Sequence, residues 1–163
     1  MSVLTINQLV SNFNFKNYTV ALFLPIIKHN ELNTSLLIQY FNENNIKWCI
    51  PKTDLKTWEM NFYSLNNLND IVVNKIGVPE PENGTLIKSN EIDLFIVPLL
   101  AHDLKGHRVG YGKGCYDRYF NNCNNKNIKI GITVFDQPID ISDSEKTDVK
   151  LDFCVTPFSK YEF

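Results

Sequence analysis

A glycine-rich stretch at residues 106–118 constrains the fold more than any other part of the chain, and it reads GHRVGYGKGCYDR. Gly110, Gly112 and Gly114 leave three backbone positions without a Cβ atom, so this loop can turn tightly and bring its N–H groups close to a ligand. Apolar residues then recur at the period of one helix face, at Tyr116, Tyr119, Phe120 and Cys123. The stretch therefore predicts a tight turn that leads directly into a helix.

Charged residues in this loop favour phosphate binding over a purely structural turn. The G-x-G-x-G spacing matches neither the dinucleotide fingerprint nor the Walker loop, so the glycines alone fit a structural turn about as well. Arg108 precedes the turn and Lys113 lies inside it, where the N–H groups and the positive dipole end of the next helix also attract an anion. Asp117 falls in the first helical turn, where the dipole alone stabilises a carboxylate but where Mg²⁺ beside a phosphate is also a suitable partner.

The composition excludes several classes of protein. The chain has 163 residues and a net charge of -2, which fits one globular domain over residues 1–163 and gives no basic excess for binding a nucleic acid. The N-terminus has no signal-peptide pattern, and the longest apolar run, Val20 to Ile27, is too short to span a membrane. We expect a cytoplasmic monomer. The cysteines show no metal-binding spacing and are expected to be reduced thiols: Cys49, Cys115, Cys123 and Cys154.

Alternating strand and helix patterns predict the fold class. Five β-prone apolar runs cover residues 18–24, 46–50, 92–97, 128–134 and 153–156. Strands that alternate with helices along the chain form three-layer α/β domains. We therefore expect a Rossmann-like domain with a mostly parallel sheet, whose ligands bind at the carboxyl ends of the strands.

The segments between these strands give weaker indications. A leading helix is expected over Ile6 to Phe13, and a second helix should begin after Asn33 or Thr34. Its apolar face is expected to comprise Leu36, Leu37, Tyr40 and Phe41. Residues 60–65 alternate like an edge strand. The second strand should end before Pro51, and residues 79–84 should be irregular because their prolines cannot donate to a ladder.

Short motifs follow one another in a fixed order between residues 18 and 157. They are LP at 24–25 with Glu31 and Thr34, GVPEP at 77–81, PLLAHD at 98–103, Gly106, Arg108, the run 110–118, Asp148, Asp152 and VTP at 155–157. In this order they resemble the signature of the 5-formyltetrahydrofolate cyclo-ligase family, whose members are also called 5,10-methenyltetrahydrofolate synthetases.

The resemblance implies an activity and a set of site residues. It implies ATP- and Mg²⁺-dependent conversion of 5-formyltetrahydrofolate to 5,10-methenyltetrahydrofolate, with release of ADP and phosphate. It gives Lys113 and Arg108 a catalytic role, because their charges offset those of the transferred phosphoryl group. The residues implied for ATP binding are Arg108, Gly110, Tyr111, Gly112, Lys113, Gly114 and Tyr116. Those implied for the folate are Glu31, Tyr111, Cys115 and Tyr116, and those for Mg²⁺ are Asp117 and Asp148, with Asp152 as the alternative to Asp148.

The chain departs from the family pattern at three places. The family has two adjacent tyrosines where this chain has Cys115 followed by Tyr116, so the fit of the pterin is expected to differ. His102 stands where the family usually has an aromatic residue; like His29 and His107, it is expected to be a polar loop residue rather than a catalyst. Family members usually begin with a basic helix that helps to bind the nucleotide. This chain has no Lys or Arg before residue 16, so weak ATP binding is expected.

Two other functions fit the same residues. One is a non-catalytic module that binds a nucleotide or a folate, and the other is a phosphotransferase that uses the glycine loop on a different small molecule. ATP binding without turnover would indicate the first function. Phosphate release with another acceptor would indicate the second.

Overall fold

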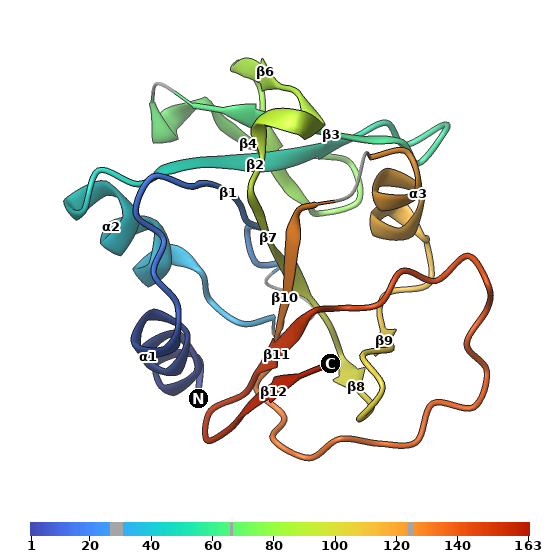
Figure 1. The fold of residues 1–163 in the computed structure, drawn as a ribbon. Coiled ribbons are helices and arrows are strands. Elements are labelled where there is room, and N and C mark those ends of the chain that lie inside the picture. The colour runs from blue at the N-terminus through green and yellow to red at the C-terminus, as the bar shows by residue number, and fades with distance from the viewer. Residues whose placement is uncertain (27–30, 66, 124–125) are drawn as a thin grey trace.

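The computed structural model describes residues 1–26, 31–65, 67–123 and 126–163, and a large mixed sheet forms its centre (Figure 1). Eight strands lie in the order β12 (Lys160–Glu162), β11 (Phe153–Val155), β10 (Ile128–Ile132), β7 (Leu94–Pro98), β1 (Thr19–Ala21), β2 (Lys47–Thr53), β3 (Met60–Ser64) and β6 (Thr85–Ile87). The five central strands, from β11 to β2, pair in parallel, whereas β12, β3 and β6 are antiparallel to their neighbours. The expected mostly parallel sheet is confirmed.

Smaller elements complete the described part of the chain. The helices are α1 (Ser2–Asn12), α2 (Ser35–Glu43) and α3 (Cys115–Asn121), with short 3₁₀ turns η2 (Leu68–Asp70) and η3 (Ser89–Glu91). Two two-stranded ribbons pair β4 (Ile71–Val73) with β5 (Pro79–Pro81), and β8 (Ala101–His102) with β9 (Arg108–Val109). Among the described residues no helix is long and apolar enough to cross a bilayer.

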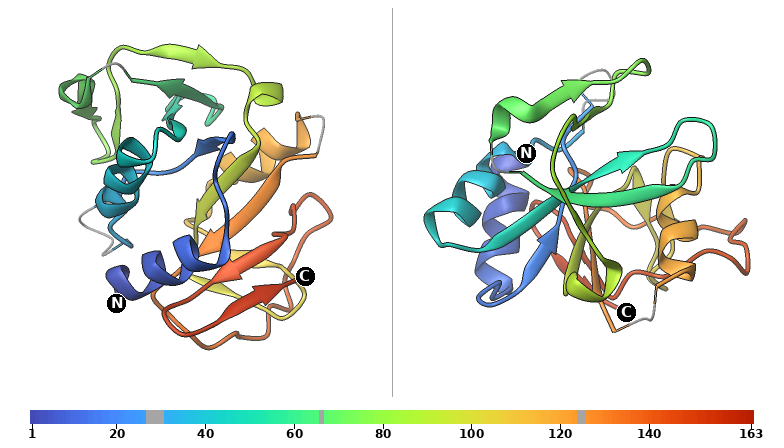
Figure 2. Two further views of the ribbon diagram at one scale, coloured as in Figure 1. Left: turned by 60° about the vertical axis from the view of Figure 1, so that its left-hand side comes forward. Right: turned by 90° about the horizontal axis from the view of Figure 1, so that it is seen from above.

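The helices cover opposite faces of the sheet. Figures 1 and 2 show α1 and α2 together on one face and α3 on the other. Alternate residues of a strand point to opposite faces. Val20 and Leu22 therefore belong to the core that α1 and α2 cover, whereas Ala21 packs in the core that includes Phe120 of α3. This arrangement confirms the expected three-layer α/β fold.

Helix α2 begins after Thr34 as expected, but the prediction of its buried face was partly wrong. Leu36 is 43% exposed, and Ile38 is buried instead, beside Phe41. The hydroxyl of Thr34 makes no capping bond but donates to the carbonyl oxygen of Phe23, at 2.7 Å. This bond links the start of the helix to the chain just after β1. A tertiary contact therefore contributes, together with the spacing of the apolar residues, to which face of the helix is buried.

Two predictions based on proline were wrong. Strand β2 continues through Pro51 to Thr53 and pairs there with β3. Pairing of β2 with β1 ends with the bond from the N–H of Leu22 to the carbonyl oxygen of Cys49, because Pro51 has no N–H for the next bond, whereas pairing with β3 continues. Pro79 and Pro81 lie in a ladder with β4, because a two-stranded ribbon needs donors on one edge only. Strand β3 is also not an edge strand, since β6 lies outside it.

Gly106 provides a test of the packing beneath the glycine loop. Its φ is +87°, and a Cβ atom would lie 2.9 Å from the carbonyl oxygen of Leu151 and 3.1 Å from Phe163. Left-handed strain and overpacking should together make Gly106→Ala lower the unfolding free energy by about 2–4 kcal/mol in chemical denaturation. Gly110→Ala is the control, since no atom lies within 4 Å of its added Cβ. Equal losses in the two variants would contradict this packing.

Candidate active site

The loops that follow β1 and β7 meet at the carboxyl edge of the sheet. Glu31 lies in the first loop, where its Oε2 accepts a hydrogen bond from the N–H of Ile26 at 2.6 Å. Tyr111 lies in the glycine loop, and burial together with a hydrogen bond to the charged Glu31 raises the pKa of its hydroxyl. The two loops therefore lie beside each other, and the roles of both residues stay predictions.

Tyr116 and Cys115 form the start of α3 beside this contact. Tyr116 is half-buried, and burial raises its pKa, as does the charge of Glu31, while Arg108 acts in the opposite direction. Burial also raises the pKa of the Cys115 thiol, although Arg118 and Lys113 favour the thiolate. Burial therefore favours the neutral thiol of Cys115 over a nucleophilic thiolate, and its contact with the substrate stays a prediction.

Asp103 organises the hairpin of β8 and β9. Its Oδ1 accepts hydrogen bonds from the N–H groups of Lys105 and His107, both at 2.8 Å, and its Oδ2 lies 2.7 Å from Nδ1 of His107. Burial tends to raise the pKa of Asp103, but the bonds from His107 and Lys105 outweigh it and hold the pKa below its usual value. His107 thus stabilises the turn that leads to Arg108, a role that the sequence did not predict.

Arg108 and Asp117 form a shielded ion pair. Nη2 of Arg108 lies 2.7 Å from Oδ1 of Asp117, and the Arg108 side chain is only 7% exposed. The N–H of Val149 donates to the same oxygen at 2.9 Å, while Nη1 of Arg108 donates to the carbonyl of Val149. The pair therefore joins β9, α3 and the segment before β11. The structure thus brings the predicted phosphate-binding cation into contact with the predicted metal-binding carboxylate.

Lys113 is exposed in the turn between two glycines with positive φ, Gly112 and Gly114. Its Nζ lies 5.0 Å from the centroid of the Trp58 ring. Nη2 of Arg118 donates to the carbonyl oxygens of Lys113, at 2.5 Å, and of Trp58, at 3.4 Å. Sequence reasoning missed both partners: Arg118 ends the glycine motif and was visible, whereas Trp58 lies far upstream and gives no local signal.

The C-terminal aspartates differ in their surroundings. Asp148 is exposed, and its Oδ2 accepts a hydrogen bond from the N–H of Glu145 at 2.9 Å. Its neighbour Val149 is the residue bonded to Asp117, so the chain brings the two predicted metal ligands close together. Asp152 instead accepts the N–H of Lys129 at 2.7 Å, which anchors it to β10. The choice between the two as a metal ligand stays a prediction.

His102 does not lie in a polar loop environment, so that expectation was wrong. Its ring is fully buried in β8, with its centroid 4.7 Å from that of Tyr161. Its Nδ1 lies 3.2 Å from the carbonyl oxygen of Asp103. The imidazole takes the packing role of an aromatic ring at a position where the family usually has one.

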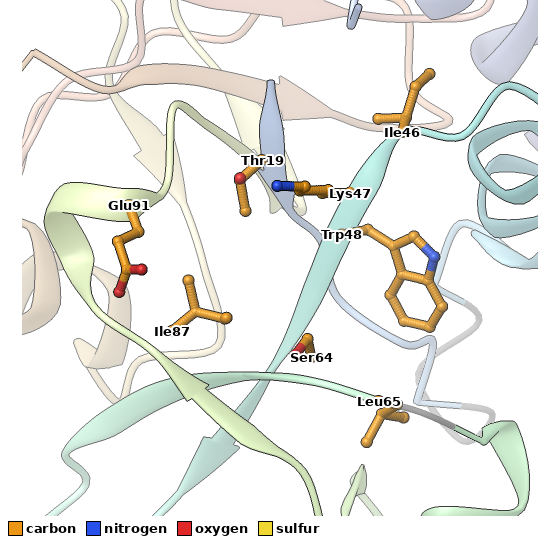
Figure 3. Close-up of a pocket in the computed structure, with 8 residues that line it drawn as sticks. All are labelled: Thr19, Ile46, Lys47, Trp48, Ser64, Leu65, Ile87 and Glu91. Carbon is orange, nitrogen blue, oxygen red and sulfur yellow. The ribbon is translucent and has the colours of Figure 1, made fainter. Parts of the chain in front are cut away.

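Hollows large enough for a small molecule lie away from these residues. One of about 380 Å³ is lined by Thr19, Ile46, Lys47, Trp48, Ser64, Leu65, Ile87 and Glu91 (Figure 3). Thr19 and Lys47 begin β1 and β2, so this hollow opens at the amino ends of the strands. A second, of about 540 Å³, adjoins the amino ends of β7 and β10. The glycine loop, its cations and Glu31 lie instead at the carboxyl edge of the sheet.

The sequence profile of the 5-formyltetrahydrofolate cyclo-ligase family matches residues 7–157. The chain belongs to this family. A 5-formyltetrahydrofolate cyclo-ligase of Mycoplasma genitalium is 33% identical over 130 residues, which cover 78% of this chain and 67% of that protein. The cyclo-ligase of Escherichia coli K12 is 27% identical over 150 residues, with coverages of 90% and 81%.

Solved structures of 5,10-methenyltetrahydrofolate synthetases have the same fold. The NMR structure of the Aquifex aeolicus synthetase has a TM-score of 0.75 and 28% identity, and the match covers 99% of this chain and 80% of that one. The Mycoplasma pneumoniae synthetase also has a TM-score of 0.75, at 26% identity, with coverages of 95% and 84%. These likenesses confirm the resemblance first seen in the short motifs.

The ion pair predicts unequal effects of two aspartate substitutions. Asp117→Ala leaves the guanidinium of Arg108, 7% exposed, without its carboxylate. We expect the unfolding free energy to fall by about 3 kcal/mol, as for other shielded pairs that lose one partner. Asp148→Ala, at an exposed position, should change it by about 0.5 kcal/mol or less. Chemical denaturation of both variants would contradict the assignment if Asp148→Ala were the more damaging.

Proposed function

We propose that the chain converts 5-formyltetrahydrofolate to 5,10-methenyltetrahydrofolate with ATP, releasing ADP and phosphate. The match of the family profile to residues 7–157 carries this proposal. The influence of Glu31 on the pKa of Tyr111 supports it, because it indicates that the predicted nucleotide loop lies beside the predicted folate-binding acid. We also propose that residues 1–163 act as a single domain.

The reaction needs positioned charges more than a covalent nucleophile. The formyl oxygen forms a bond to the γ-phosphorus of ATP, and the bond from that phosphorus to ADP breaks. Nitrogen 10 of the folate then bonds to the formyl carbon and loses its proton to water, and the carbon–oxygen bond breaks as phosphate leaves. In the transition state of phosphoryl transfer, charge is spread over the three equatorial phosphoryl oxygens, so the useful protein groups are N–H donors and cations near the γ-phosphate.

The glycine loop supplies these groups in the proposed complex. Gly110, Gly112 and Gly114 allow the backbone N–H groups to approach the phosphates without a side chain between them. Lys113 is exposed and can direct its ammonium to the γ-phosphate. Arg108 would have to leave Asp117 to bind phosphate directly, so we assign it a fixed positive charge beside the nucleotide. Glu31 is proposed to accept N–H groups of the pterin, with Tyr116 and Cys115 as neighbouring walls.

The proposed Mg²⁺ ligands are Asp117 and Asp148. Oδ1 of Asp117 takes bonds from Arg108 and Val149, which leaves Oδ2 for a cation. No group of three or more His, Cys, Asp or Glu side chains suited to a metal occurs in the described parts of the chain. Two carboxylates nevertheless fit Mg²⁺, which usually takes one or two protein carboxylates together with phosphate oxygens and water. When bound there, Mg²⁺ would offset charge on the nucleotide phosphates.

The direct test is the reaction itself. Purified protein incubated with 5-formyltetrahydrofolate, ATP and Mg²⁺ should form the methenyl product, seen by its near-ultraviolet absorbance, with ADP and phosphate in equal amounts. Chelation of Mg²⁺ should stop product formation. Folded protein that binds both substrates without turnover would indicate a non-catalytic binding module. Phosphate release with another acceptor, and no methenyl product, would indicate a different phosphotransferase.

Lys113 should contribute mainly to the transition state. Lys113→Ala removes the exposed cation of the loop, and we expect kcat to fall by about 10² to 10³, as when one preorganised charge donor is lost. Lys105→Ala, an exposed lysine on the β8–β9 turn, is the matched control and should keep normal turnover. Similar rates for the two variants would show that Lys113 is an ordinary surface cation.

Since α1 carries neither Lys nor Arg, weak ATP binding stays a prediction that calorimetry can check.

A further inference from the structure

Trp58 lies against the glycine loop although it belongs to a different part of the fold. It is in the turn between β2 and β3, which reaches the side of the sheet covered by α3 (Figure 1). Its ring centroid is 5.0 Å from Nζ of Lys113. Arg118 bonds to the carbonyl oxygens of both residues, at 2.5 Å for Lys113 and 3.4 Å for Trp58. The ring and the ammonium are thus held together through their backbones as well as through their side chains.

The backbone of Trp58 has an unfavourable conformation. Its φ is +59°, a left-handed value that costs a residue with a large side chain about 1–2 kcal/mol. The turn maintains it: the N–H of Trp58 donates to the carbonyl of Asp54 at 2.7 Å, and the N–H of Asp54 donates to that of Glu59 at 2.9 Å. Oδ1 of Asp54 also accepts the N–H of Lys56 at 2.7 Å. These bonds keep the indole beside the loop despite the strain.

An aromatic partner suits a lysine that must meet phosphate. The ion pairs found within residues 1–26, 31–65, 67–123 and 126–163 involve His107, Arg108 and Lys129, and none of them joins Lys113 to a carboxylate. A carboxylate there would repel phosphate and compete for the ammonium. A ring face attracts the cation by only about 0.5–1 kcal/mol and leaves its other N–H groups to donate. Ordering a free lysine side chain, by contrast, costs up to about 2 kcal/mol.

We propose that Trp58 is a positioning residue for Lys113: its ring holds the ammonium beside the glycine loop before and after the nucleotide binds. Part of the ordering of Lys113 is then complete in the free protein. The identity of the ligand as ATP rests on the proposed function, whereas the contact between ring and ammonium does not. No role in folate binding is assigned to Trp58.

Nuclear magnetic resonance tests the contact without any turnover. Ring currents should move the ε-methylene protons of Lys113 upfield of those of other lysines, with the signal identified by its loss in Lys113→Arg. The shift should disappear in Trp58→Leu and persist with a non-hydrolysable ATP analogue. An ordinary shift in the free protein would overturn the inference and leave the proposed function untouched. So would a shift that disappears when calorimetry shows the analogue bound.

A double-mutant cycle separates positioning from a merely structural role. Trp58→Leu should lower kcat/KM for ATP and weaken calorimetric binding of the ATP analogue by about 2- to 5-fold, the rate equivalent of one exposed cation–π contact. KM for 5-formyltetrahydrofolate should stay unchanged. In a Lys113→Ala background the same substitution should have no further effect on ATP binding. Trp58→Phe, which retains a ring face, should restore most of the loss and also serves if Trp58→Leu fails to fold.

The outcomes of the cycle distinguish the two proposals. An equal loss from Trp58→Leu in both backgrounds, or a loss as large in Trp58→Phe as in Trp58→Leu, would overturn the positioning role. Coupled effects on nucleotide binding without any methenyl product would overturn the proposed function and leave the positioning role standing. Trp48→Phe is the matched control, because the chain has only two tryptophans and Trp48 lines the hollow at the opposite edge. It should leave ATP binding unchanged.

Discussion

The ion pair between Arg108 and Asp117 is the contact on which the rest of the site depends. With the two bonds to Val149, it fixes the β8–β9 hairpin, helix α3 and the C-terminal segment relative to one another. A guanidinium this little exposed needs its carboxylate, since an unpaired charge there is strongly destabilising. The same contact determines where the glycine loop ends and where Asp148 lies, so the structural and the chemical roles of this pair cannot be separated.

The pair also divides the work between the two cations of the loop. The guanidinium of Arg108 is shielded from solvent and paired with Asp117. The ammonium of Lys113 is exposed and lies against the ring of Trp58. In the proposed complex, Arg108 supplies a fixed charge beside the nucleotide, and Trp58 holds the ammonium of Lys113 beside the glycine loop. On the other side, Glu31 and Tyr111 meet through a hydrogen bond at the carboxyl edge.

The sequence predicted the fold class and the composition of the site better than its contacts. Helical periodicity and apolar runs were enough to predict the strands and α3, because burial of one face imposes these patterns on the local sequence. They failed at Ile38, where a bond from Thr34 to the chain after β1 adds a tertiary contact at the start of α2. The proline rule failed at Pro51, because β2 continues there by pairing with β3 after its ladder with β1 has ended. The Arg108–Asp117 pair and the contact with Trp58 depend on how separate segments come together, which local patterns do not encode.

Transfer of the γ-phosphoryl group to the formyl oxygen is the central claim about this chain, and isotope labelling tests it most directly. The protein would be given 5-formyltetrahydrofolate labelled with ¹⁸O in its formyl group, together with unlabelled ATP and Mg²⁺ in ordinary water. The inorganic phosphate would then be examined by mass spectrometry. The account predicts one ¹⁸O atom in each phosphate released, because the carbon–oxygen bond breaks when the ring closes. Methenyl product accompanied by unlabelled phosphate would contradict it.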